Sequence, residues 1–146
     1  MVLSVLNKYR DTGLLILRIG FGGMYLFHGW PKISGGPERW TKLGGAMGNL
    51  GIDILPTFWG FLAAVSEFFG GLCLIFGLFF GWAALLMAAT MAVAAVNHFS
   101  RGDGLSGASH AIENGIVLFC LIFIGPGKYS LAALLGRKAE QSSHSS

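Results

Sequence analysis

Charged side chains are scarce in this sequence: they make up 12% of its 146 residues, whereas hydrophobic residues make up 53%. A soluble domain carries roughly 25% charged residues, so an ordinary water-soluble domain is excluded. The apolar residues fall in long runs, which predicts that a lipid bilayer surrounds the chain. The net charge of +3 is small and scattered. Because no basic run or nucleic-acid-binding motif occurs, we expect no nucleic acid partner.

Cysteine is equally scarce. The two cysteines, Cys73 and Cys120, each lie in an apolar run and form no CxxC pair. A disulfide framework and thiol–disulfide chemistry are therefore not expected of this chain. No haem, flavin or iron–sulfur signature occurs, so no intrinsic redox cofactor is expected. The first apolar run contains Arg18 and lacks a small-residue cleavage site, so we interpret it as a retained span rather than a signal peptide.

The apolar runs predict an all-α protein, a bundle of four transmembrane helices. The expected spans are residues 13–30, 57–80, 82–99 and 110–124. Between the first two, Pro37 opens a segment whose apolar residues share one stripe, which predicts a short amphipathic helix in the membrane interface. The stripe consists of Trp40, Leu43, Met47 and Leu50. In the third span, the alanines at 84, 88, 92 and 95 form a small-residue stripe that favours close helix packing.

These ranges divide the chain into three parts. They are residues 1–12, a four-span membrane domain over 13–125, and a C-terminal segment over 126–146 that ends in a polar, Ser-rich tail expected to be disordered. Four spans place both termini on one side of the membrane. That side holds five lysines and arginines (Lys8, Arg10, Lys128, Arg137, Lys138) and the other holds four (Lys32, Arg39, Lys42, Arg101). The small excess predicts cytoplasmic termini in a multi-pass inner-membrane protein.

Two ionisable residues lie deep in the first two spans. Such groups are costly in hydrocarbon and normally turn inward and pair. Glu67 lies about 15 Å into its span, near the bilayer centre, and Arg18 lies about 7 Å in from the opposite side. Because an arginine side chain can stretch most of the remaining distance, the sequence predicts a buried Arg18–Glu67 ion pair. The pair is interpreted either as a structural ion pair that holds the two helices together or as a functional group.

Further ionisable residues gather at the end of the bundle opposite the termini, where spans one and three end and span four begins. They are His28, Lys32, His98, His110 and Glu113. We predict that they line one ligand-binding pocket, in which imidazoles beside a carboxylate exchange protons with a bound molecule such as a quinone. The alternative is that each side chain reaches independently toward the membrane surface. No metal is assigned, since no HxxxH or ExxH spacing fixes two ligands on one helix turn.

Several of these residues belong to segments that resemble the DoxX family. The segments are Leu17–Gly20, Phe27–Lys32 with its HGxxK pattern, Glu67–Leu72 followed by Phe76–Leu78, and Asn97–His98. The resemblance covers roughly residues 13–125 and implies a four-span inner-membrane protein. Its founding members are named for a subunit of an archaeal thiosulfate:quinone oxidoreductase, and others are associated with membrane redox complexes and oxidative stress. The residues of this sequence that match the motifs of the family are Arg18, His28, Lys32, Glu67 and His98. The resemblance identifies neither a substrate nor a catalytic residue.

Three functions remain open on the sequence alone. The first is a subunit of a membrane oxidoreductase system that handles quinone or another small redox partner, with other electron carriers in a partner subunit. The second is a small-molecule, proton or ion transporter subunit in which Glu67 acts as a relay. A unit this small would need to form a homo-oligomer to make a path. The third is a non-catalytic assembly subunit, so whether the chain is an enzyme stays open.

Overall fold

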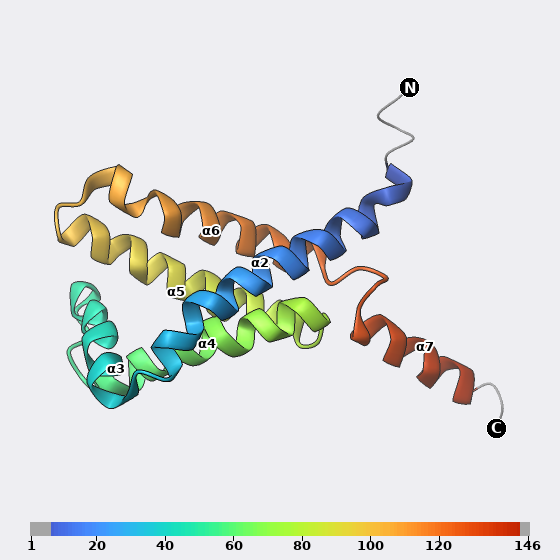
Figure 1. The fold of residues 1–146 in the computed structure, drawn as a ribbon, viewed down its shortest axis with the longest axis horizontal. Helices are drawn as coiled ribbons and strands as arrows, with labels where there is room; N and C mark the ends of the chain where they lie inside the picture. Colours follow the sequence, from blue (N-terminus) through green and yellow to red (C-terminus); the bar gives the residue numbers. More distant parts are fainter. Residues whose placement is uncertain (1–6, 144–146) are drawn as a thin grey trace.

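The computed structural model describes residues 7–143 and confirms an all-α protein. The described residues form η1 (Asn7–Tyr9), α2 (Arg10–Ile33), α3 (Gly36–Gly44), η2 (Gly45–Leu50), α4 (Pro56–Phe76), α5 (Phe80–Ser100), α6 (Gly104–Ile124) and α7 (Leu131–Ser143). The long helices pack in sequence order: α2 lies against α4, α4 against α5, and α5 against α6. Figure 1 shows α3 at one end of this elongated body, and the starts of α2 and α7 at the other end.

Three of the described helices, α4, α5 and α6, are long and apolar enough to cross a membrane. They correspond to the second, third and fourth predicted spans. Helix α2 has 24 residues but is not among the three. It carries Arg18 and His28 within its apolar run, and these polar side chains lower its hydropathy. The predicted four-span bundle therefore depends on α2, and its fourth crossing stays a prediction.

The ends of the helices differ from the predicted ranges. Pro31 was expected to follow the first span, but α2 continues to Ile33. A proline so near the end of a helix loses only one backbone hydrogen bond, and the N–H of Ser34 still binds the Trp30 carbonyl at 3.0 Å. The predicted spans 57–80 and 82–99 leave Gly81 as the turn between α4 and α5. The turn lies instead at Gly77, which adopts the left-handed conformation (φ 68°) that ends α4.

The C-terminal segment also differs from its prediction. Its polar composition predicts a disordered tail, but α7 extends to Ser143, while residues 144–146 lie outside the described residues. Ser130 explains the start of this helix, because its Oγ accepts the backbone N–H of Ala133 at 3.2 Å. The local cap therefore favours a helix that composition alone does not reveal.

Glycines bring the helices of the bundle into close contact. A methyl group added at Gly22 of α2 would lie 2.7 Å from the Gly71 carbonyl oxygen of α4. Where α3 crosses α4, a methyl at Gly44 would overlap the Pro56 carbonyl, and one at Gly60 the Trp40 carbonyl. Small residues permit such backbone approach in lipid. The predicted alanine stripe contributes less, since Ala84 is buried but Ala92 is exposed.

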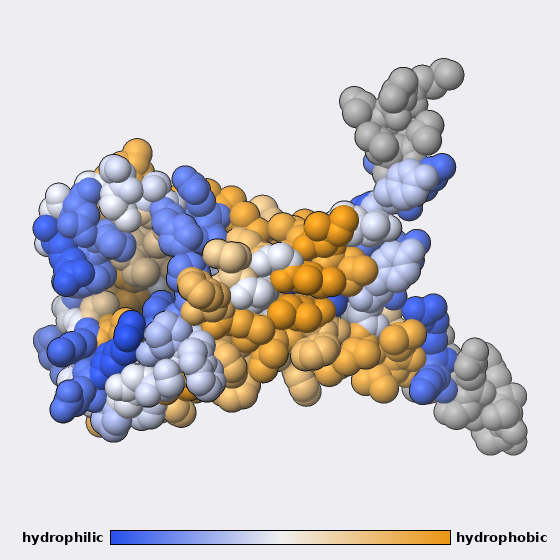
Figure 2. All heavy atoms as spheres, in the orientation of Figure 1, coloured by the Kyte–Doolittle hydropathy of each residue, from blue (hydrophilic) through white to orange (hydrophobic). Residues whose placement is uncertain are grey.

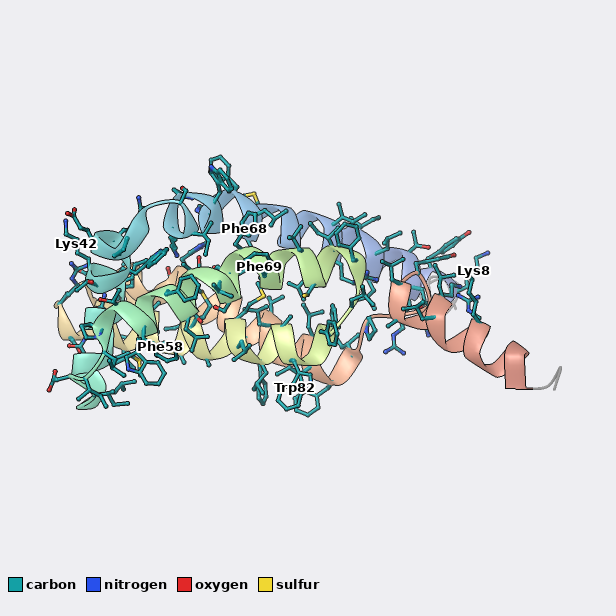
Figure 3. The ribbon with its side chains drawn as sticks, turned by 90° about the horizontal axis from the view of Figure 1, so that it is seen from below. Lys8, Lys42, Phe58, Phe68, Phe69 and Trp82 are labelled. Carbon is teal, nitrogen blue, oxygen red and sulfur yellow. The ribbon has the colours of Figure 1, made fainter. Side chains whose placement is uncertain are left out.

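Apolar side chains cover both the inside and the outside of the molecule. Buried residues such as Leu74, Met87 and Leu118 form the core, while Trp82 and Phe123 are among many large hydrophobic residues on the surface. Figure 2 shows this apolar surface as an orange belt between hydrophilic ends, and Figure 3 places Lys8 and Lys42 at those opposite ends. An exposed apolar belt of this extent fits a lipid environment.

Candidate functional site

A cavity of about 590 Å³ opens between α3, η2, α4 and α5. Its apolar lining includes Met47, Trp59, Leu62, Ala63, Leu86, Ala89, Val93 and Ala94. Its polar lining consists of Lys32, Arg39, Lys42, Ser66, Glu67, Thr90, Asn97 and Arg101. A concave, mostly apolar site with a few convergent polar groups is the usual form of a small-molecule site.

The most buried polar group of the cavity is the carboxylate of Glu67. Lys32 donates to both of its oxygens, with Nζ 2.7 Å from Oε1 and 2.5 Å from Oε2. The side chain of Glu67 is 4% exposed and that of Lys32 is 26% exposed. Lys32 reaches Glu67 because Gly29, one turn earlier in α2, packs directly on the backbone of Phe68. The pair therefore lies between helices, with the lysine open to the cavity.

A tryptophan helps to hold the end of α2 in place. The Nε1–H of Trp40, in α3, donates to the Lys32 carbonyl at 2.9 Å. Carbonyls in the last turn of a helix lack partners within the helix, so this bond satisfies one of them. The Trp40 ring also packs edge-on against Phe61 of α4, with the ring centroids 4.8 Å apart. These contacts fix the backbone from which Lys32 extends.

The predicted Arg18–Glu67 pair is wrong. Arg18 is 1% exposed and donates instead to four backbone carbonyls. These are Leu74 (2.8 Å), Ile75 (2.8 Å), Pro126 (2.6 Å) and Tyr129 (3.1 Å). Since α2 and α4 run antiparallel, Arg18 lies opposite the end of α4, whose last carbonyls need donors. Glu67 lies opposite Lys32, so each helix end offers a nearer partner than the long-range pair.

Two hydroxyl groups join α4 to α5 at the cavity wall. Ser66 Oγ and Thr90 Oγ1 lie 2.8 Å apart. Each also lies within hydrogen-bond distance of a carbonyl of its own helix, Ala63 for Ser66 and Leu86 for Thr90. The sequence prediction did not include these two residues, nor Trp59, Arg39, Lys42 and Arg101. A hydroxyl residue inside an apolar run, next to an intramembrane carboxylate, was the available signal for Ser66.

The five residues predicted to line one pocket do not share a pocket in the structure. Lys32 is the one that lines the cavity. The rings of His28 and His110 are neighbours on the exposed surface, with centroids 6.2 Å apart. His98 Nδ1 lies 2.8 Å from Asp103 Oδ2, and Glu113 is exposed. Depth along the span places these residues at one end, but the rotation of each helix turns four of them away from the cavity.

The histidines and acids at this end make contacts of their own. The side-chain amide of Asn114 lies 3.1 Å from His110 Nε2, one turn away on α6. Within the part of the chain that the structure describes, no group of three or more His, Cys, Asp or Glu side chains is arranged to hold a metal ion. The cavity, with its Lys32–Glu67 pair, is therefore the arrangement best suited to bind a small molecule.

Comparison with known proteins confirms the resemblance drawn from the residues. The DoxX family model matches residues 13–99, which include every residue that lines the cavity except Arg101. The chain is 32% identical over 140 residues to the inner membrane protein YqjF of Escherichia coli, covering 91% of this chain and 99% of that protein. It is 30% identical over 132 residues to an uncharacterised protein of Haemophilus influenzae, covering 86% and 92%. No solved structure matches the chain significantly.

Proposed function

The chain belongs to the DoxX family of membrane proteins, and from this premise we propose that it is the quinone-binding subunit of a membrane oxidoreductase system. The single observation that supports this proposal is the cavity between α3, η2, α4 and α5, with the Lys32–Glu67 pair in its wall. The cavity has an apolar surface on which a flat ring can pack. It also has hydrogen-bonding groups that can bind the oxygens of the ring.

The donors in the cavity match a quinone carbonyl. A lysine ammonium has three N–H donors, and Glu67 occupies Lys32 through two oxygens. One donor therefore remains for a ligand in the cavity, toward which Lys32 is partly exposed. The hydroxyl pair of Ser66 and Thr90 supplies a further polar contact on the wall. In this arrangement, Lys32 binds one quinone oxygen while Leu62 and Val93 contact the ring.

The same pair can exchange protons with the ligand. Reduction of a quinone to a quinol takes up two electrons and two protons. The two electrons come from an electron carrier in a partner subunit. The Lys32 ammonium gives up the two protons one at a time and regains each from solvent, to which it is 26% exposed, while the Glu67 carboxylate stabilises the ammonium. The role of this chain is then to hold the quinone and to pass protons to or from it, with the electron carrier elsewhere.

The test is to purify the protein in a mild nonionic detergent, extract any bound quinone from the purified protein, and measure the amount that co-purifies. Titration with decylubiquinone, followed by tryptophan fluorescence, to which Trp59 in the cavity wall contributes, gives the affinity. Lys32→Gln and Glu67→Gln are expected to weaken binding at least several-fold. The matched control is Glu113→Gln, which removes an exposed carboxylate outside the cavity. Absence of quinone from the purified wild type, together with no saturable binding, overturns the proposal.

A second function, proton or ion transport, is favoured by one observation. Glu67 lies in the middle of an apolar helix, and its carboxylate lines a cavity beside a lysine. Intramembrane carboxylates often mark proton paths. Proteoliposomes that contain a pH-sensitive dye distinguish the two: proton flux that Glu67→Gln abolishes, without quinone binding, favours transport. Protein that shows neither flux nor binding supports the assembly-subunit alternative.

A further inference from the structure

The cavity carries an excess of positive charge at its opening. Its lining includes four cations, Lys32, Arg39, Lys42 and Arg101, and one carboxylate, Glu67. Lys32 and Glu67 neutralise each other, since they form an ion pair. The other three cations are exposed and also line the cavity. We call them the cationic rim: Arg39, Lys42 and Arg101. The residues that line the cavity therefore keep three positive charges after the buried pair is counted.

No acid at this end forms an ion pair with a rim residue in the part of the chain that the structure describes. Among the described residues, the ion pairs are Lys32–Glu67, His98–Asp103 and Lys128–Asp11, and none contains a rim residue. Asp103 pairs with His98, and the other three exposed acids at this end do not line the cavity: Glu38, Asp53 and Glu113. The three cations also converge from two separate parts of the chain, because Arg39 and Lys42 belong to α3 and Arg101 follows α5.

The cationic rim and the apolar wall together match one kind of ligand. Figure 3 places Lys42 at the hydrophilic end of the molecule, while Leu86 and Ala89 belong to the apolar run of α5. A molecule that fills the cavity would place an apolar body among these side chains and a polar end at the rim. Opposite charges attract most strongly where part of the water is excluded. The end that faces the rim is then favoured when it carries a negative charge.

We propose that the cavity selects an acidic quinone: a flat, redox-active ring that bears a carboxylate or sulfonate. This proposal rests on the proposed function, because it uses the same cavity and the same contact of Lys32 with the ring oxygen. It adds that the cationic rim binds the acidic group, and that a neutral quinone of the same shape binds less tightly. The phosphate of an anionic lipid shares this charge, and the test separates the two.

The test compares two ligands that share one ring and differ in the group at position 2, which is anionic in anthraquinone-2-carboxylate and neutral in 2-(hydroxymethyl)anthraquinone. Full-length protein in phosphatidylcholine nanodiscs is titrated with each, and the quenching of tryptophan fluorescence gives the dissociation constants. The carboxylate is expected to bind more tightly than the alcohol, and the difference is expected to shrink as salt is added, because salt screens exposed charges. Equal binding of the two ligands at low salt overturns the proposal and leaves the proposed function standing. Binding of neither ligand overturns both.

Single variants assign the preference to the rim. Arg39→Gln, Lys42→Gln and Arg101→Gln are each expected to weaken binding of the carboxylate by up to about fivefold, the range for exposed charge pairs. None is expected to change binding of the alcohol. The matched control is Arg10→Gln, an exposed arginine at the far end of α2. A preference that survives the triple rim variant, or that disappears when the nanodiscs contain phosphatidylglycerol, overturns the assignment of the rim to an acidic quinone.

Discussion

Gly29 of α2 allows a direct test of how the site is held together. A methyl group added there would lie 2.8 Å from the backbone nitrogen of Phe68 and 2.9 Å from its Cα. Both atoms belong to the backbone of α4, so rotation of a side chain cannot relieve the contact. A methyl group added at Gly20, on the same helix, would meet no atom within 4 Å. The same substitution at these two positions therefore separates helix packing from helix propensity.

The magnitudes of the two changes follow from this difference. Gly20→Ala is expected to stabilise the protein by up to about 1 kcal/mol, since alanine has the higher helix propensity. Gly29→Ala gains the same propensity but forces α2 away from α4, and overpacking costs about 1–3 kcal/mol. The free energy of unfolding should then be about 1–3 kcal/mol lower for Gly29→Ala than for Gly20→Ala, because the propensity gain is common to both. Quinone affinity should fall as well, because Lys32 moves with the end of α2.

Reversible unfolding in mixed micelles, followed by circular dichroism as the denaturing detergent is increased, measures both free energies. The two variants share one helix and one chemical change, so effects of the detergent cancel in the comparison. Equal stability of the two proteins would refute the close packing of α2 on α4. Lys32 would then have no structural reason to lie beside Glu67.

Three further predictions follow from the polar contacts and the charge pattern. Arg18→Met leaves four carbonyls without their donor and should lower the free energy of unfolding by about 3 kcal/mol or more; a loss below about 1 kcal/mol contradicts the buried carbonyl cluster. Glu67→Gln should cost about 1–3 kcal/mol, less than a fully buried pair because Lys32 is 26% exposed. The double variant with Lys32→Gln should recover part of that loss, and strict additivity argues against the pair. A periplasmic reporter should be active when fused at residue 103 and inactive when fused after residue 138, and the reverse pattern contradicts cytoplasmic termini.

The apolar runs of the sequence predict the long helices well but their ends poorly. Hydropathy indicates which residues prefer lipid, and three predicted spans coincide with α4, α5 and α6. Helix ends depend on local backbone contacts that hydropathy does not describe. Gly77 ends α4 through its left-handed conformation, and Ser130 caps α7. Composition predicts a turn at Gly81 and a disordered tail, because it contains no information about these caps.

The candidate site was predicted only in part, for two physical reasons. The depth of a residue in its span gives its height along the bundle, but the rotation of the helix decides which side it faces. His28, His98, His110 and Glu113 were placed at the correct end, yet they do not line the cavity. In addition, the partners of Arg18 are backbone carbonyls, which every residue carries and no motif reveals.

Two of the cations of α2, Arg18 and Lys32, hold this helix, the least apolar of the long helices, against α4. Arg18 and Lys32 lie on the face that packs on α4, about 21 Å apart along the helix axis. Arg18 holds one end through carbonyls of α4 and of the chain before α7, and Lys32 holds the other through Glu67. Close glycine contacts lie between them. The two ends are not equivalent, since Arg18 is sealed from solvent whereas Lys32 is open to the cavity. A ligand that binds the third N–H of Lys32, as proposed above, would therefore leave both the Lys32–Glu67 pair and the contacts of Arg18 in place.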